Sequence, residues 1–157
     1  MKEKNIVTPY ISFDFEELTP DIRKLVTLAK QATYRAYAPY SHFNVGAAIA
    51  LDNGEIVCGS NQENAAFPSS TCAERTAAYY AHATYPEAKF TAIAISARGT
   101  DSQFVAEPIP PCGGCRQALV EYETLAGHDV PVYLVGVDKI YRLPSVKSLL
   151  PFSFTEF

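Results

Sequence analysis

Two short motifs, TCAER and PCGGC, hold the residue types in this chain that could do chemistry. They contain three of the four cysteines, Cys72, Cys112 and Cys115, together with the carboxylate of Glu74. Thiolates are ligands that zinc prefers, and three protein ligands leave the fourth tetrahedral position open for water. A carboxylate beside that position can take a proton from the water and return it to a leaving group. The two motifs therefore predict a catalytic zinc site for hydrolysis.

The same cysteines also fit other interpretations. A lone Cys-x-x-Cys pair could be part of a structural zinc site, a redox pair or two buried thiols. A structural zinc site needs a fourth ligand, which would be Cys58 or a histidine. Cys58 lies in the middle of a predicted strand and is interpreted as a buried small hydrophobic residue. His42, His82 and His128 lie apart in the sequence and are interpreted as surface or packing residues.

Composition predicts one globular domain in a reducing compartment. The chain has 157 residues, of which 48% are hydrophobic and 19% are charged, and its net charge is -4. This acidic balance argues against a nucleic-acid partner held mainly by phosphate contacts. There is no apolar run of about 20 residues and no signal-peptide core at the N-terminus, so we expect a cytoplasmic protein with reduced cysteines. We expect residues 1–20 to be an N-terminal extension of unknown function and residues 21–157 to form the domain.

Hydrophobic periodicity and turn residues predict the element order α-β-β-α-β-α-β-β-α. Helices are expected from Pro20 with Thr19 as N-cap, from residue 72, from residue 112 to a stop at Gly127, and after Ser145 as a short final helix. The expected strands are residues 45–51, 55–60, 90–96, 130–137 and 139–144. The alternating residues 11–18 also fit a short edge strand. This order predicts an α/β fold, a three-layer α/β/α sandwich on a mixed five-stranded sheet.

Both cysteine motifs open a predicted helix. The unpaired N–H groups and the positive end of the helix dipole favour thiolate there and lower the cysteine pKa. Cys112 and Cys115 are three residues apart, so both can face one way from the first helical turn. Cys72 is distant in sequence, and the fold must bring it to the other two.

Four blocks and a C-terminal segment resemble the small, homotetrameric, zinc-dependent cytidine deaminases of pyrimidine salvage. They are PYSHFNVGAA, NQENAAFP, TCAERTA, PCGGCRQ and SLLPFSF. The resemblance implies a cytidine deaminase-like fold and one zinc ion per chain. It implies hydrolysis of cytidine and 2′-deoxycytidine to uridine and 2′-deoxyuridine with release of ammonia. It also implies a homotetramer with shared active sites and neither a nucleic-acid nor a membrane partner.

For the reacting centre, the resemblance assigns roles to five residues. Cys72, Cys112 and Cys115 match the zinc ligands, and Glu74 matches the catalytic proton shuttle. Three thiolates on a dication leave a net charge of −1, which weakens the pull of the metal on water. Arg75 matches an arginine that hydrogen-bonds a ligand sulfur and offsets this charge.

For the substrate, the resemblance assigns Asn61 and Glu63 to the ribose 3′-hydroxyl and Phe43 to the face of the pyrimidine ring. Three further residues match positions that reach the pocket from a neighbouring subunit, two near the ribose 5′-hydroxyl and one as a C-terminal aromatic that closes it: Ala65, Phe67 and Phe154. From the residues alone, NQEN is a polar turn, and Phe43 and the C-terminal aromatic are core residues.

Three other functions share some of these features. A deaminase of an aminoacyl nucleoside antibiotic such as blasticidin S has the same zinc motifs, although Arg75 and the LLPFSF tail favour cytidine. Deaminases of tRNA or single-stranded DNA usually have histidine where this chain has Cys72, and they carry basic surfaces. A non-catalytic zinc-binding module would have four protein ligands and no need for Glu74.

Overall fold

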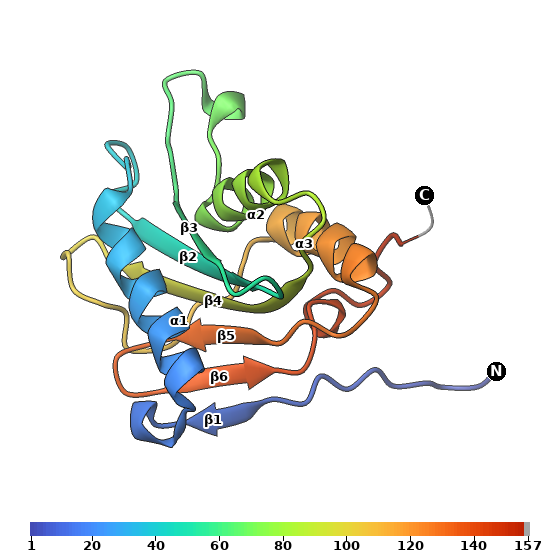
Figure 1. The fold of residues 1–157 in the computed structure, drawn as a ribbon. Coiled ribbons are helices and arrows are strands. Elements are labelled where there is room, and N and C mark those ends of the chain that lie inside the picture. The colour runs from blue at the N-terminus through green and yellow to red at the C-terminus, as the bar shows by residue number, and fades with distance from the viewer. Residues whose placement is uncertain (156–157) are drawn as a thin grey trace.

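A mixed sheet of six strands forms the centre of this computed structural model, which describes residues 1–155 (Figure 1). The strand order across the sheet is β1-β6-β5-β4-β2-β3. β4 and β5 pair in parallel, and the other neighbouring pairs are antiparallel. In chain order the strands are β1 (Ile11–Phe13), β2 (Asn44–Leu51), β3 (Ile56–Ser60), β4 (Phe90–Arg98), β5 (Val132–Val135) and β6 (Ile140–Leu143).

The prediction of five strands is wrong because part of the N-terminal segment adds a sixth. β1 pairs with β6 in antiparallel register, with Ile11 opposite Arg142 and Phe13 opposite Ile140. The suggested edge strand in this region is therefore confirmed. β1 covers backbone N–H and C=O groups that β6 would otherwise present at an open edge of the sheet.

Helices cover both faces of the sheet, as predicted for a three-layer sandwich. α1 (Pro20–Ala32) lies against one face, whereas α2 (Ala73–Thr84) and α3 (Gly113–Ala126) lie side by side against the other (Figure 1). Within residues 1–155, no helix is long and apolar enough to cross a bilayer. The short 3-10 turns are η1 (Phe15–Glu17), η2 (Thr33–Arg35), η3 (Phe67–Ser69) and η4 (Lys147–Leu149).

Alternate residues of the central strands fill two separate cores. Ala47 and Ile93 belong to the core under α2 and α3, whereas their neighbours Ala48 and Ala94 belong to the core under α1. All four side chains are fully buried. Strands that are buried on both faces have nearly continuous apolar sequences, which explains why NVGAAIAL and FTAIAIS predicted buried strands.

Two glycines let the helices approach the sheet closely. A Cβ atom at Gly59 in β3 would collide with the backbone nitrogen of Ala77 in α2. A Cβ atom at Gly46 in β2 would collide with the carbonyl oxygen of Ala29 in α1. A glycine provides the space for such close backbone contacts. Since Cys72 is the residue directly before α2, the packing of this helix on β3 helps to fix the position of its thiol.

The predicted start of α1 and the predicted end of α3 are confirmed, but the predicted final helix is not. Pro20 is the first residue of α1, and Gly127 ends α3 with a φ of 75°. The expected short helix after Ser145 is a single 3-10 turn, η4, with Val146 at the N-cap. The prediction of Ser145 as the cap is wrong because its hydroxyl donates a hydrogen bond to Glu123 instead.

The buried carboxylate of Glu123 fastens the C-terminal part of the chain to α3. Its side chain is only 2% exposed. Oε1 accepts hydrogen bonds from the Ser145 hydroxyl and the Lys147 N–H, each at 3.1 Å. Oε2 accepts from the N–H groups of Val130 and Val146, at 2.9 and 2.7 Å. Four donors satisfy both oxygens, which is the condition for burying a carboxylate.

Glu123→Ala is expected to lower the free energy of unfolding by about 4 kcal/mol, because it leaves several donors without an acceptor and opens a cavity. Glu123→Gln should cost less, since it keeps the shape and one acceptor oxygen. Urea unfolding followed by circular dichroism measures both, with Glu121→Ala on the same helix as the control. A loss for Glu123→Ala that equals the control would contradict this role.

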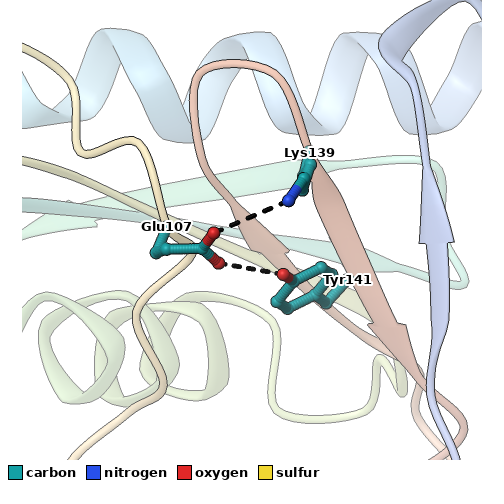
Figure 2. A network of polar contacts seen from close by, with 3 residues as sticks. All are labelled: Glu107, Lys139 and Tyr141. Atoms are coloured by element: carbon teal, nitrogen blue, oxygen red, sulfur yellow. Dashed lines mark hydrogen bonds and ion pairs between the residues drawn. The ribbon is translucent and has the colours of Figure 1, made fainter.

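The loop 99–111, which ends directly before Cys112, is fastened to the strand hairpin of β5 and β6. Figure 2 shows the carboxylate of Glu107 between Lys139 and Tyr141. Nζ of Lys139 lies 3.6 Å from Oε1, and the Tyr141 hydroxyl donates to Oε2 at 2.9 Å. The hydrogen bond to Glu107 raises the pKa of Tyr141. Exposed contacts of this kind add little stability, but they restrict the path of the loop into the cysteine motif.

Candidate active site and metal centre

The three cysteines of the two motifs meet at the N-terminal ends of α2 and α3. Cys72 is the N-cap of α2, Cys112 is the N-cap of α3, and Cys115 lies in the first turn of α3. Their Sγ atoms lie within 4.8 Å of one another, and those of Cys72 and Cys112 are 3.8 Å apart. The prediction that the fold brings Cys72 to the other pair is confirmed.

The surroundings of this cluster favour negative charge on sulfur. The two helix N-termini present unpaired N–H groups and the positive ends of their dipoles. A hydrogen bond from the thiol of Cys115 lowers the pKa of Cys72 to about 5, and Arg75 acts in the same direction. The pKa of Cys115 is raised, first by this hydrogen bond to Cys72 and then by burial. Thiolate is the form that binds a soft metal.

The residues around the cluster fit a zinc ion. Three converging thiols are a zinc donor set, and they leave one tetrahedral position for water. Nη2 of Arg75 donates to Sγ of Cys72 at 3.7 Å, which places a positive charge beside the thiols. Nε of Arg75 is buried and has no hydrogen-bond partner in the described part of the chain. A negatively charged zinc–thiolate centre would stabilise this buried donor.

Glu74 is the carboxylate that accompanies the cluster. It lies in the first turn of α2, and its side chain is only 4% exposed. Burial raises the pKa of Glu74, the charge of Cys72 acts in the same direction, and a hydrogen bond with Cys115 opposes the shift. A carboxyl group whose pKa is raised toward neutral pH suits repeated proton transfer.

Arg75→Gln is expected to lower kcat about 10-fold to 100-fold, the range typical for residues that support metal ligands. Most of the zinc should stay bound, because all three thiols remain. Steady-state kinetics and metal analysis of the same samples measure the two effects separately. Arg142→Gln on β6 is the matched control, and an Arg75→Gln variant with the kcat of the wild type would exclude the role in charge balance.

Asn61 and Glu63, predicted to bind a sugar hydroxyl, also hold the segment that leads into β2. Oδ1 of Asn61 accepts a hydrogen bond from the Val45 N–H at 2.7 Å, and its Nδ2 donates to the carbonyl oxygen of Phe43 at 2.9 Å. Oε2 of Glu63 accepts from the N–H groups of Tyr40 and of the next residue, at 2.8 and 3.2 Å. These bonds fix both side chains, so NQEN is more than a polar turn.

The apolar residues that were predicted to contact the substrate differ in their exposure. Phe43 is half-buried directly before β2. Phe67 is 70% exposed in the segment before α2, where its ring meets that of Tyr40, and Ala65 beside it is exposed as well. Phe154 is 66% exposed. The interpretation of Phe154 as a core residue of a single chain is therefore wrong.

The structure does not bring a fourth ligand from Cys58 or a histidine into the cluster, as far as residues 1–155 describe it. Cys58 lies on the edge strand β3 and is exposed, so its interpretation as a buried hydrophobic residue is wrong. His42 and His128 are exposed, and the ring of His82 packs against Tyr122. The histidines are surface and packing residues, as predicted.

Two residues directly after the PCGGC motif make contacts that the sequence did not predict. Nη1 of Arg116 donates to the carbonyl oxygen of Leu149 at 2.9 Å, and the side chain of Gln117 hydrogen-bonds the backbone of Phe154. These partners lie 33 and 37 residues further along the chain. Because no local spacing links residues so far apart, the pattern around the motif carries no signal for them.

A three-layer sandwich with three thiols and a buried carboxylate at paired helix N-termini defines a zinc hydrolase. The family model described as the cytidine and deoxycytidylate deaminase zinc-binding region matches residues 19–126. The chain belongs to this deaminase family. The family resemblance and the zinc cofactor predicted from the sequence are both confirmed.

Individual relatives agree with this assignment. The chain is 38% identical to a cytidine deaminase of Halalkalibacterium halodurans, over 86% of this chain and 95% of the relative. It is also 38% identical to a cytidine deaminase of Sporosarcina psychrophila, over 87% of this chain and 93% of the relative. Among solved structures, the cytidine deaminase from Burkholderia pseudomallei matches with a TM-score of 0.71 and 37% identity, covering 87% of this chain and all of that one.

Proposed function

We propose that this protein hydrolyses cytidine and 2′-deoxycytidine to uridine and 2′-deoxyuridine, with release of ammonia, in pyrimidine salvage. The observation that supports this most strongly is the buried Glu74 beside the three thiols of Cys72, Cys112 and Cys115. Relatives that cover most of the chain are named cytidine deaminases. We also propose residues 21–157 as the deaminase domain, with residues 1–20 as an extension that adds β1 to its sheet; the family model matches residues 19–126 of this range.

Different residues of this chain bind the metal, transfer protons and balance charge in the proposed reaction. Cys72, Cys112 and Cys115 would hold one zinc ion per chain, which would supply Lewis acidity for the hydrolysis. Glu74 accepts one proton from the attacking water and delivers it to N3 of the pyrimidine. It then accepts the second proton of that water, from the new C4 hydroxyl group, and transfers it to the departing amino group. The C4–N bond breaks, a C4–O bond remains, and water and cytidine are converted to uridine and ammonia. Arg75 offsets the excess negative charge of the thiolates.

The nucleoside is bound by groups that the fold already holds in place. In our proposal, Asn61 and Glu63 hydrogen-bond the ribose 3′-hydroxyl, and Phe43 packs against the pyrimidine ring. Both polar side chains accept hydrogen bonds from backbone N–H groups, Glu63 from Tyr40 and Asn61 from Val45. These bonds support this role, because preorganised groups lose little entropy on binding. A site built to bind a hydroxyl group also rejects analogues that lack it.

We further propose a cytoplasmic homotetramer in which each active site uses residues of a neighbouring subunit. Ala65 and Phe67 would approach the ribose 5′-hydroxyl, and Phe154 would close the pocket. The exposure of Phe67 and Phe154 in a single chain supports contacts outside it, because large exposed aromatic side chains are typical of interfaces, and Ala65 is exposed in the same segment as Phe67. Neither a nucleic acid nor a membrane takes part in this proposal.

A substrate panel tests the proposed function. The kcat/KM of the purified zinc enzyme is measured on cytidine, 2′-deoxycytidine, blasticidin S and a cytosine-containing RNA oligonucleotide. We expect turnover of both nucleosides at comparable rates and little turnover of the other two. Preference for blasticidin S would identify an antibiotic deaminase, and preference for the oligonucleotide would identify a nucleic-acid deaminase. Stable zinc binding without any turnover would indicate a structural metal module.

A further inference from the structure

The C-terminal segment lies beside α3, and side chains of that helix hold it there (Figure 1). Nε2 of Gln117 donates to the carbonyl oxygen of Phe154 at 2.8 Å, and the N–H of Phe154 donates to Oε1 of Gln117 at 3.1 Å. The carboxamide of Gln117 thus donates one hydrogen bond to the backbone of Phe154 and accepts another from it. This is the hydrogen-bond pattern of one paired position in an antiparallel sheet.

This contact begins in the same part of α3 that carries the metal ligands. Gln117 is two residues after Cys115. Its neighbour Arg116 donates from Nε to the carbonyl oxygen of Pro111 at 2.8 Å, directly before Cys112. The guanidinium of Arg116 also donates to the carbonyl oxygen of residue 149, where the C-terminal segment begins. The first turns of α3 therefore connect the cysteine motif and the tail.

The tail presents two aromatic rings on this fixed backbone. Phe152 is 96% exposed, and Phe154 is 66% exposed. Phe152 has a φ of 56°, in the left-handed region that residues other than glycine seldom adopt. Such a turn needs contacts that stabilise it, and the paired hydrogen bonds of Gln117 lie two residues further on. An aromatic ring held in one place can stack on a planar heteroaromatic ligand.

We propose that Gln117 is a positioning residue for the nucleoside site. Its two hydrogen bonds fix the backbone of Phe154, so the aromatic ring is in place before the substrate arrives. This arrangement should increase the affinity for the nucleoside, because a preorganised group loses less conformational entropy when the ligand binds. This inference rests on the proposed function, since the molecule that the ring contacts is the substrate of the deaminase.

Kinetics of Gln117→Ala and Gln117→Glu test the inference. The glutamate keeps the acceptor oxygen for the Phe154 N–H, but it replaces the donor to the Phe154 carbonyl with a second oxygen, which repels that carbonyl. We expect both variants to raise KM for cytidine about tenfold, with kcat within about twofold of the wild type and zinc content unchanged. Gln31→Ala on α1 is the matched control. An unchanged KM in Gln117→Ala would overturn the proposal.

A double mutant separates positioning from a general loss of packing. If Gln117 acts through Phe154, then Gln117→Ala should have almost no effect on KM once Phe154→Ala is present. If KM of the double mutant instead rises by the product of the two single-mutant factors, Gln117 acts by another route and the proposal is wrong.

A spectroscopic measurement makes the test independent of turnover. The chain has no tryptophan, so Phe154→Trp introduces a single tryptophan in the tail, which can be excited selectively at wavelengths that tyrosine does not absorb. Adding Gln117→Ala should decrease its fluorescence anisotropy, because the backbone at residue 154 is no longer held against α3. Unchanged anisotropy would refute the positioning role, whatever the activity. A decrease together with no cytidine turnover by the wild type would instead support the tail contact and reject the proposed substrate.

Discussion

Glu74→Gln is expected to lower kcat for cytidine by about 10⁴-fold, at the upper end of the range for general acid–base catalysis. The reaction requires several proton transfers, and Glu74 is the buried carboxyl group beside the three thiols. The amide keeps the size and shape of the side chain but cannot accept and return a proton. Because Glu74 is not among the three clustered ligands, zinc content should stay at about one ion per chain.

The control for this variant is Glu87→Gln, which changes an exposed carboxylate after α2 and should leave kcat unchanged. Thermal unfolding of Glu74→Gln should show that the fold is retained. A Glu74→Gln enzyme with zinc bound and the kcat of the wild type would remove Glu74 from the reaction. Loss of zinc from this variant would show that the carboxylate is needed to hold the metal.

Cys115→Ser is expected to abolish both zinc binding and deamination. Its side chain is fully buried between the two helix N-termini, and a hydroxyl is a much weaker zinc ligand than a thiolate. The loss of activity should exceed the roughly 100-fold cost of removing a residue that only supports a ligand. Zinc should raise the melting temperature of the wild type, because a ligand that binds only the folded state stabilises it. The variant should not show this rise.

Cys58 provides a matched cysteine control. It is exposed on β3 and lies outside the cluster, so Cys58→Ser should keep the zinc content, the zinc-dependent melting temperature and kcat. Metal analysis, differential scanning calorimetry and kinetics check the three properties. Normal zinc content in Cys115→Ser would exclude Cys115 as a ligand. Zinc loss in Cys58→Ser would show that the metal uses a donor outside the three-thiol cluster.

The features that were predictable from the sequence depend on local patterns. Continuous apolar runs predicted β2 and β4, because both faces of these strands are covered. The two cysteine motifs predicted ligands at helix N-termini, and Cys72 and Cys112 are the N-caps of α2 and α3. Residue type and spacing are sufficient to predict such features, since zinc binds only a few kinds of protein ligand and these recur at characteristic spacings.

The features that were not predictable depend on contacts between distant residues. Pairing of β1 with β6 joins positions about 130 residues apart, so a short alternating segment could not decide the strand count. The sequence pattern of Cys58 is that of a buried strand residue, but the order of strands in the sheet leaves it at an edge. Glu123 looks like an ordinary helix carboxylate until the fold brings four donors to it.

The most direct test of the proposed function is the product balance of the purified zinc enzyme with cytidine. Loss of cytidine absorbance is followed while uridine and ammonia are quantified, with zinc measured in the wild type and in Glu74→Gln. We predict equal amounts of uridine and ammonia from the wild type, none from the variant, and about one zinc per chain in both. Zinc in both proteins without formation of uridine by the wild type would contradict the proposal that this protein is a cytidine deaminase.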